Sequence, residues 1–284
     1  MKDRRPDPKP RKNPQLWQSY LWWEELKEMR KRHTLRQSSA ERGKSNYDAQ
    51  FEVDAMEHMA LDKLIDDAQA AMQSYGRAVG PIWDWLTELR GVGDHTAAKL
   101  LAMVDDIGKF DTISKLWRFA GYGLYAYWFD ARGTCRGPAV GYRMGENGER
   151  ERVVLTPQAG WEQRAVTDRP VKGYMLPYYR KFKSEVYLVS ESFMKQRTPI
   201  YREVYDSEKE RIRIEHPNPV PNPYGPQKQR YTDMHVHLMA LRKVSKLFLS
   251  HLWLKWREAD GLPISEPWVL AYTEHSTMIE PPPG

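Results

Sequence analysis

Apolar residues recur at three- and four-residue intervals along most of the chain, which is the spacing of one helix face. The pattern predicts helices over residues 14–36, 48–75, 199–214 and 231–259, and further helices that begin at 81 and 177. The last helix is expected to bury an apolar stripe and to expose a basic side. The stripe consists of Met234, Leu238, Leu241, Phe248 and Leu252. The basic side consists of Arg242, Lys243 and Lys246.

The pattern changes after residue 123. Residues 124–129 are aromatic and typical of a strand, and 131–172 is rich in glycine. Within that stretch, 140–144 and 151–155 are expected to pair around Glu146-Asn147-Gly148, because Asn-Gly favours a tight hairpin turn. The fold is therefore predicted to be mainly α, a helical domain with a helix-hairpin-helix motif and a small irregular or β insertion.

Residues 89–104, LRGVGDHTAAKLLAMV, carry the most informative motif. An apolar helix end runs into Gly91-Val92-Gly93, and a helix rich in small residues comes next. Gly91 and Gly93 are expected to allow positive φ and close backbone approach, with Val92 pointing into the hairpin and Gly93 or Asp94 capping the next helix. This pattern is typical of a helix-hairpin-helix motif.

The first amides of such a helix have no intrahelical acceptor, and together with the helix dipole they favour a phosphate. Phosphate contacts of this kind do not read base sequence. The predicted DNA-binding residues are Gly91, Val92, Gly93, Asp94, His95, Thr96, Lys99, Lys115 and Arg118. The alternative is an ordinary helical corner in which glycine is only the C-cap.

The segments of the chain are predicted from these patterns and from the prolines. They are a disordered basic arm (1–13), an N-terminal helical region (14–80), a helix-hairpin-helix region (81–123), a glycine-rich or β insertion (124–176), C-terminal helices (177–260) and a proline-rich tail (261–284). A second Gly-x-Gly at 121–123 begins 30 positions after the first (121 − 91) and is interpreted either as a degenerate second hairpin or as chance.

Composition narrows the class of protein. The 284 residues carry a net charge of +6, which suits a nucleic-acid partner when it is unevenly placed. Cys135 is the single cysteine, so neither an internal disulfide nor a multi-thiolate zinc site is expected. Without a membrane-spanning apolar run or a signal peptide, the protein is expected in the cytoplasm, associated with a bacterial nucleoid.

Residues 89–123 resemble the C-terminal domain of transposases of the insertion-sequence one-ten family. The resemblance rests on the Gly-hydrophobic-Gly turn, the Thr-Ala pair, Phe110, and the Leu116-to-Gly121 ending. The helix MALRKVSKLFLSHLW, residues 239–253, is similar to a later helix of that domain. The resemblance implies a protein of a mobile genetic element that binds double-stranded DNA.

The chain also departs from that family. Its transposases carry a RuvC-like nuclease fold with metal-binding carboxylates, whereas about 85 residues precede the hairpin here and they predict helices. The carboxylates of this region are interpreted as a solvated face; they are Asp48, Asp54, Asp62, Asp66 and Asp67. A serine nucleophile expected soon after the Ala-Gly ending is missing, and no catalytic role is assigned to Thr134 or Cys135.

The leading hypothesis is a DNA-binding, transposase-like or transposition-accessory protein, with no catalytic residues assigned, no metal site and no cofactor. The rival is an active recombinase or nuclease that needs Mg²⁺ or a partner nuclease subunit; a helical scaffold protein is the third reading. An RNA partner and a homo-oligomer remain open. His235 and His237 would share a metal only on a strand, and the helical pattern predicts that they face different ways.

Overall fold

The computed structural model describes residues 10–145, 149–167, 170–222, 229–264 and 279–283. The protein is mainly α, with small antiparallel sheets, as predicted. It has two compact units: unit 1 contains residues 1–88 and 92–107, and unit 2 contains residues 89–91 and 108–283. The predicted segments divide the chain differently, because the helices on either side of the hairpin turn pack with the N-terminal helices.

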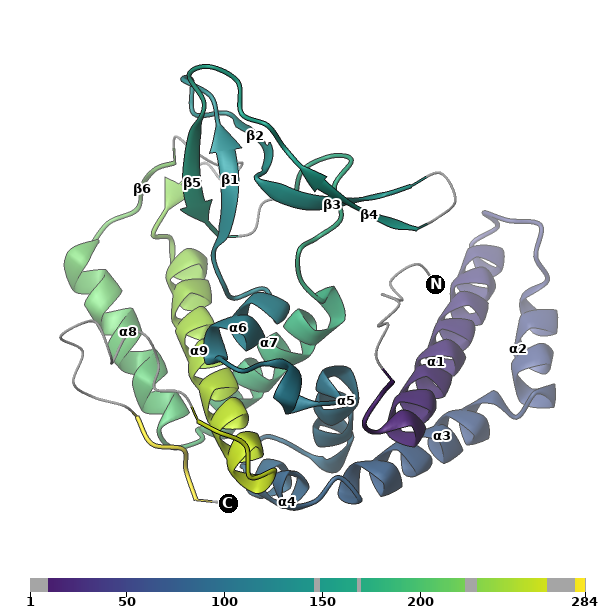
Figure 1. Cartoon of the computed structure of the whole chain (residues 1–284). Coiled ribbons are helices and arrows are strands. Elements are labelled where there is room, and N and C mark those ends of the chain that lie inside the picture. The colour runs from purple at the N-terminus through teal and green to yellow at the C-terminus, as the bar shows by residue number, and fades with distance from the viewer. Residues whose placement is uncertain (1–9, 146–148, 168–169, 223–228, 265–278, 284) are drawn as a thin grey trace. The chain divides into compact units, whose positions relative to one another are not determined.

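The described residues of unit 1 form helices and no strands. The helices are α1 (Pro14–Glu41), α2 (Ala49–His58), α3 (Leu61–Arg77), α4 (Pro81–Glu88) and α5 (Asp94–Val104). Helix α1 packs on α2, α3 and α5, and α3 also packs on α5. Figure 1 shows α1 and α3 in purple and blue. The predicted helix over 48–75 is interrupted at Ala60, whose φ is +47°.

Close packing in unit 1 depends on small residues. Ala97 and Ala98 have no exposed surface, and a Cβ added at Gly76 would lie 3.3 Å from the Cβ of Ala98 and 2.5 Å from the Trp83 ring. The start of α1 is tied to the end of α5, because the Asn13 amide donates to the buried Asp105 carboxylate at 3.0 Å. Helices α1, α3 and α5 therefore have a fixed arrangement.

Over its described residues, unit 2 combines helices with three small sheets. Its helices are α6 (Ile113–Phe119), α7 (Arg180–Gln196), α8 (Tyr201–Glu215) and α9 (Asp233–Ala259), with a 3₁₀ turn at Ile107–Lys109 where the chain enters it. Helix α9 packs against α6, α7 and α8 (Figure 1). Thr112 is the N-cap of α6, and the side chain of the preceding residue, Asp111, accepts a hydrogen bond from Lys115.

Most strands of unit 2 come between α6 and α7 in the sequence. Strands β1 (Tyr125–Phe129), β2 (Cys135–Pro138) and β5 (Glu162–Val166) form an antiparallel sheet in the order β2-β1-β5. Strands β3 (Val140–Met144) and β4 (Arg150–Val154) pair as the predicted hairpin, although residues 146–148 of its turn lie outside the described residues. A short pair, β6 (Val220–Pro221) and β7 (Gln229–Arg230), precedes α9.

The surface of α9 differs in part from its prediction. Leu241, Phe248 and Leu252 are buried, but Met234 is 65% exposed and Leu238 is 38% exposed. Both lie in the first turns of α9. The buried face there is instead supplied by Val236 and Ala240, so the predicted stripe is wrong at its beginning.

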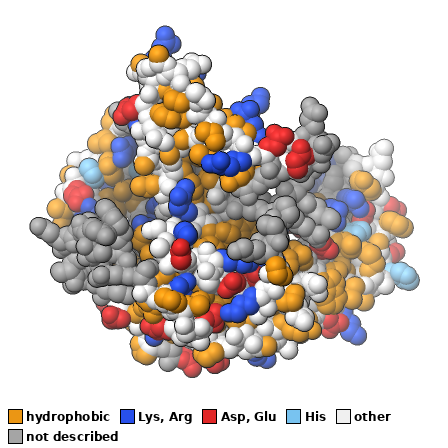
Figure 2. All heavy atoms as spheres, viewed as in Figure 1, with side chains coloured by type: hydrophobic (Ala, Val, Ile, Leu, Met, Phe, Trp, Pro, Cys, Tyr) orange, Lys and Arg blue, Asp and Glu red, His pale blue; other side chains and the backbone are white. Residues whose placement is uncertain are grey.

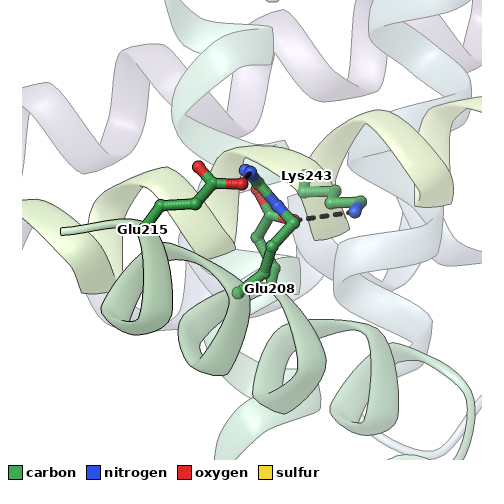
Figure 3. A network of polar contacts seen from close by, with 4 residues as sticks. Glu208, Glu215 and Lys243 are labelled. Atoms are coloured by element: carbon green, nitrogen blue, oxygen red, sulfur yellow. Dashed lines mark hydrogen bonds and ion pairs between the residues drawn. The ribbon is translucent and has the colours of Figure 1, made fainter. Parts of the chain in front are cut away.

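The basic side of α9 is largely engaged within unit 2. Lys243 binds the Glu208 carboxylate of α8 at 2.7 Å (Figure 3). Hydrogen bonds from Arg211 and Lys243 hold the pKa of Glu208 below its ordinary value. Arg242 donates to the Tyr122 carbonyl at 2.7 Å, and the Lys246 ammonium lies 4.0 Å from the centre of the Trp117 ring. These cations therefore join α9 to its neighbours.

The predicted arm and tail are described only in part. Residues 1–9 of the arm and 265–278 and 284 of the tail lie outside the described residues. Among the described residues, no helix combines the length and the apolar character needed to cross a membrane.

Candidate nucleic-acid interface

The turn between α4 and α5 joins two helices, as both predicted alternatives require. Val92 is 3% exposed, so its side chain is buried as expected. Gly91 has a φ of +105°, a conformation that L side chains rarely adopt. Its carbonyl accepts a hydrogen bond from the Ser192 hydroxyl at 2.8 Å, and the Arg90 carbonyl accepts one from Thr198 at 2.6 Å. The first half of the turn is thus held by side chains of unit 2.

The start of α5 is open. Gly93 is its N-cap, is exposed, and supplies no side-chain cap. A Cβ added at Gly93 would meet no atom within 4 Å. Its φ is −92°, so Gly93 does not use the positive φ that glycine allows; it has the extended backbone of an ordinary N-cap, the role expected of Gly93 or Asp94. The Gly93 carbonyl accepts the Ala97 amide, which leaves the amides of residues 94–96 ahead of the first helical bond.

Asp94 places a carboxylate at this helix start. Its Oδ2 accepts a hydrogen bond from Arg77 of α3 at 2.7 Å. Both side chains are well exposed, at 60% for Arg77 and 44% for Asp94. Arg77 therefore offsets the negative charge of Asp94, and the ion pair keeps the guanidinium beside the first turn of α5.

His95 is packed against α1. Its ring centre lies 4.6 Å from that of Trp23 in an edge arrangement. Burial, then the Lys99 and Lys27 ammoniums, lower the pKa of His95 to about 4, so the imidazole is neutral at pH 7. The His95 Nδ1 and the indole Nε1 of Trp23 are both buried without a hydrogen-bond partner in the structure.

Two lysines share the Trp23 ring. The ammonium groups of Lys27 and Lys99 each lie 5.6 Å from its centre. Lys99 is 8% exposed, so most of its side chain is buried, whereas Lys27 is exposed. The start of α5 is thus accompanied by Lys27, Arg77 and Lys99, of which only Lys99 was among the predicted residues. Trp23, Lys27 and Arg77 carry no local signal, because only tertiary packing brings α1 and α3 beside α5.

Thr96 lies in the first turn of α5, and the last two predicted DNA-binding residues lie on α6 of unit 2. Lys115 binds Asp111 at 2.7 Å, and both side chains are exposed. Arg118 is exposed and lies 5.7 Å from the centre of the Tyr125 ring. Figure 2 shows acidic side chains interspersed among the basic ones on the face in view. Contact with a polyanion would therefore depend on local clusters.

Several of the aspartates and histidines that a metal-dependent enzyme could use have partners of their own. Asp48 caps α2, and Asp62 binds Arg30 at 3.1 Å. His235 Nδ1 accepts the Tyr231 amide at 2.9 Å, while His237 Nδ1 is hydrogen-bonded to Tyr205 at 2.6 Å. Within the described part of the chain, no three potential metal-ligating side chains of His, Cys, Asp or Glu lie together.

Comparison with protein-family models gives no match, and no curated protein matches the chain significantly.

Proposed function

We propose that this protein binds double-stranded DNA through the phosphate backbone, and that the first amides of α5 make the central contact. The observation that carries the proposal is the exposed, uncapped start of α5 behind a glycine turn. A helix start without a side-chain cap offers both its amide donors and the positive end of its dipole to an anion.

The charges beside α5 support the same contact. Arg77 offsets the charge of the Asp94 carboxylate. The ammonium groups of Lys27 of α1 and Lys99 of α5 both lie near the ring of Trp23, which belongs to α1. Binding of this kind positions a protein on DNA without selecting a base sequence. The resemblance of residues 89–123 to the insertion-sequence one-ten family supports a role in transposition. The proposed role is a transposase-like or transposition-accessory protein of a mobile genetic element.

Duplex DNA binding can be tested by fluorescence anisotropy across a salt series. The affinity should fall linearly on a log–log plot as salt rises, because neutralised phosphates release their counterions. Two substitutions then probe α5 itself. Gly93→Asn and Gly93→Asp each supply a side-chain oxygen that caps the free amides, and Gly93→Asp also adds a negative charge.

Both variants should melt at a temperature at or above that of the parent, since asparagine and aspartate are better N-caps than glycine. Gly93→Asp should weaken duplex binding by about tenfold, roughly the worth of one charged contact, and Gly93→Asn should weaken it less. Ala70→Asp, at an exposed position of α3, adds the same charge and serves as the control. Unchanged affinity in Gly93→Asp, or binding that is indifferent to salt, would contradict the proposal.

A further inference from the structure

A cavity of about 390 Å³ lies in unit 2, remote in sequence from the hairpin. Its walls come from strands β1 and β3, from residues 170–177 and from Arg118 of α6. The volume falls in the range of about 300–1,000 Å³ that is typical of small-ligand pockets. It is large enough to hold one planar ring system and part of what is attached to it.

The lining is aromatic with a few polar groups. Tyr125 and Tyr127 are 5% and 2% exposed and form a buried part of the wall, whereas Tyr142 and Tyr174 are half-buried. Gln163 of β5 is exposed and adds an amide, which can both donate and accept hydrogen bonds. Flat aromatic surfaces beside an amide suit a planar ligand with polar edges.

Contacts with neighbouring backbone hold the part of the lining that contains Tyr142 and Tyr174. A Cβ added at Gly141 would lie 2.6 Å from the Tyr174 ring, so this ring lies directly against the β3 backbone. The Tyr142 carbonyl accepts the Met175 amide at 2.7 Å, and the Tyr174 amide donates to Val171 at 3.0 Å. A ligand would find the Tyr174 ring and the backbone that carries Tyr142 already ordered, which lowers the entropic cost of binding.

Cations accompany the tyrosines. The Arg143 guanidinium lies 4.2 Å from the centre of the Tyr174 ring and donates to its hydroxyl at 2.6 Å. Arg118 lines the cavity itself, and both arginines are exposed. Aromatic rings that stack bases beside arginines that attract the backbone are the usual elements of single-strand binding surfaces. A purely apolar ligand would make no use of Gln163 or the arginines.

We infer that this cavity binds an unstacked nucleobase of a single-stranded nucleic acid. Tyr142 and Tyr174 contact the ring, Gln163 hydrogen-bonds to its edge, and Arg118 and Arg143 attract the flanking phosphates. The inference rests on the proposed function in treating the protein as a nucleic-acid-binding protein, but it concerns a different unit and a different form of the nucleic acid.

The test measures anisotropy of the full chain with single-stranded DNA and RNA of about 12 nucleotides, a length typical of such sites. Tyr142→Ala should weaken binding at least about fivefold, the lower bound for loss of one base–aromatic stack. Tyr142→Phe should retain most of the affinity. Gln163→Ala should weaken binding, whereas Gln158→Ala, at an exposed glutamine that does not line the cavity, should not.

Photo-crosslinking with 5-bromouracil in both oligonucleotides locates the base independently of any substitution. Crosslinks to Tyr142 or Tyr174 in the folded protein support the inference, and a stronger RNA signal would add a 2′-hydroxyl contact to it. Crosslinks confined to other regions, or no binding of either strand, would overturn it. Crosslinking to Tyr142 or Tyr174 reports on the cavity alone, whereas duplex binding by Gly93→Asp reports on the start of α5, so the two proposals can fail independently.

Discussion

The two Gly-x-Gly turns of this protein share a sequence pattern and differ in what surrounds them. Gly91-Val92-Gly93 leads into helix α5, and Gly93 stands in open space. Gly121-Tyr122-Gly123 leads into strand β1, and both of its glycines are tightly enclosed. The second turn is therefore not a complete second hairpin, in keeping with the strand predicted after it.

The backbone amides of the two turns have different acceptors. In the second turn, the amides of Tyr122 and Gly123 both donate to the Trp117 carbonyl, at 2.8 and 3.1 Å, and the Gly121 amide donates to Arg118 at 3.2 Å. Those donors are used up in ending α6. The first turn instead starts a helix, where the leading amides have no earlier carbonyl to bind. The element that the glycines lead into, a helix or a strand, therefore determines the chemistry of the turn.

Gly121→Ala tests the enclosed turn and should have the largest effect. The φ of +76° is strained for alanine, and the added Cβ would lie 2.8 Å from the buried Tyr178 ring. We expect a loss of about 2–4 kcal/mol in the free energy of unfolding, from backbone strain and overpacking together. Urea denaturation monitored by circular dichroism measures it.

Gly133→Ala is the matched control for that prediction. Gly133 has nearly the same φ, +75°, but an added Cβ would meet nothing within 4 Å. It should therefore carry only the strain, about 1–2 kcal/mol. Equal losses in the two variants would show that enclosure of the second turn contributes nothing to stability.

Gly91→Ala tests the first half of the open turn and should have a smaller effect. Its φ of +105° is unfavourable for alanine, and the new Cβ would lie 3.1 Å from the Ser192 hydroxyl and 3.3 Å from the Phe193 ring. We expect a loss of about 2 kcal/mol by the same denaturation assay. Gly80→Ala, with a φ of +112° and open space, should lose slightly less. A larger loss at Gly80 would refute the packing contribution at Gly91.

Local patterns predicted much of the fold because they determine single elements. The β3–β4 hairpin was predicted from two strand-like runs around Asn-Gly, and α9 from its apolar spacing. The break at Ala60 escaped prediction because neither glycine nor proline marks it. The exposed start of α9 escaped it because apolar residues lie on both sides of its first turns, and spacing alone does not say which side is buried.

The candidate site could be predicted only along α5. The glycine turn and the small residues that follow it are local features, and the structure confirms that Ala97 and Ala98 are buried. The surroundings of α5 are not local: Trp23 and Lys27 come from α1, and Arg77 comes from α3. The lowered pKa of His95 depends on these neighbours, so the sequence could not reveal it.

That histidine gives a last difference between the turns, since His95 lies just after the open one. Its pKa of about 4 lies below the ordinary value of 6.5. Between these values the unfolded chain binds more protons than the native protein, so the free energy of unfolding should fall as pH decreases from 6.5 toward 4. Allowing for solvent screening, we expect a loss of about 1–2 kcal/mol from this group.

His95→Gln should remove that part of the acid sensitivity. The measurement is urea denaturation of both proteins at several pH values from about 7 to about 4.5, a window set by the pKa of His95. His251, whose pKa burial also lowers to about 4, is present in both proteins, so its contribution cancels in the comparison. If the two stability curves run parallel with pH, His95 is not buried against Trp23 beside two lysines. The start of α5 would then lack the neighbours that distinguish it from the second turn.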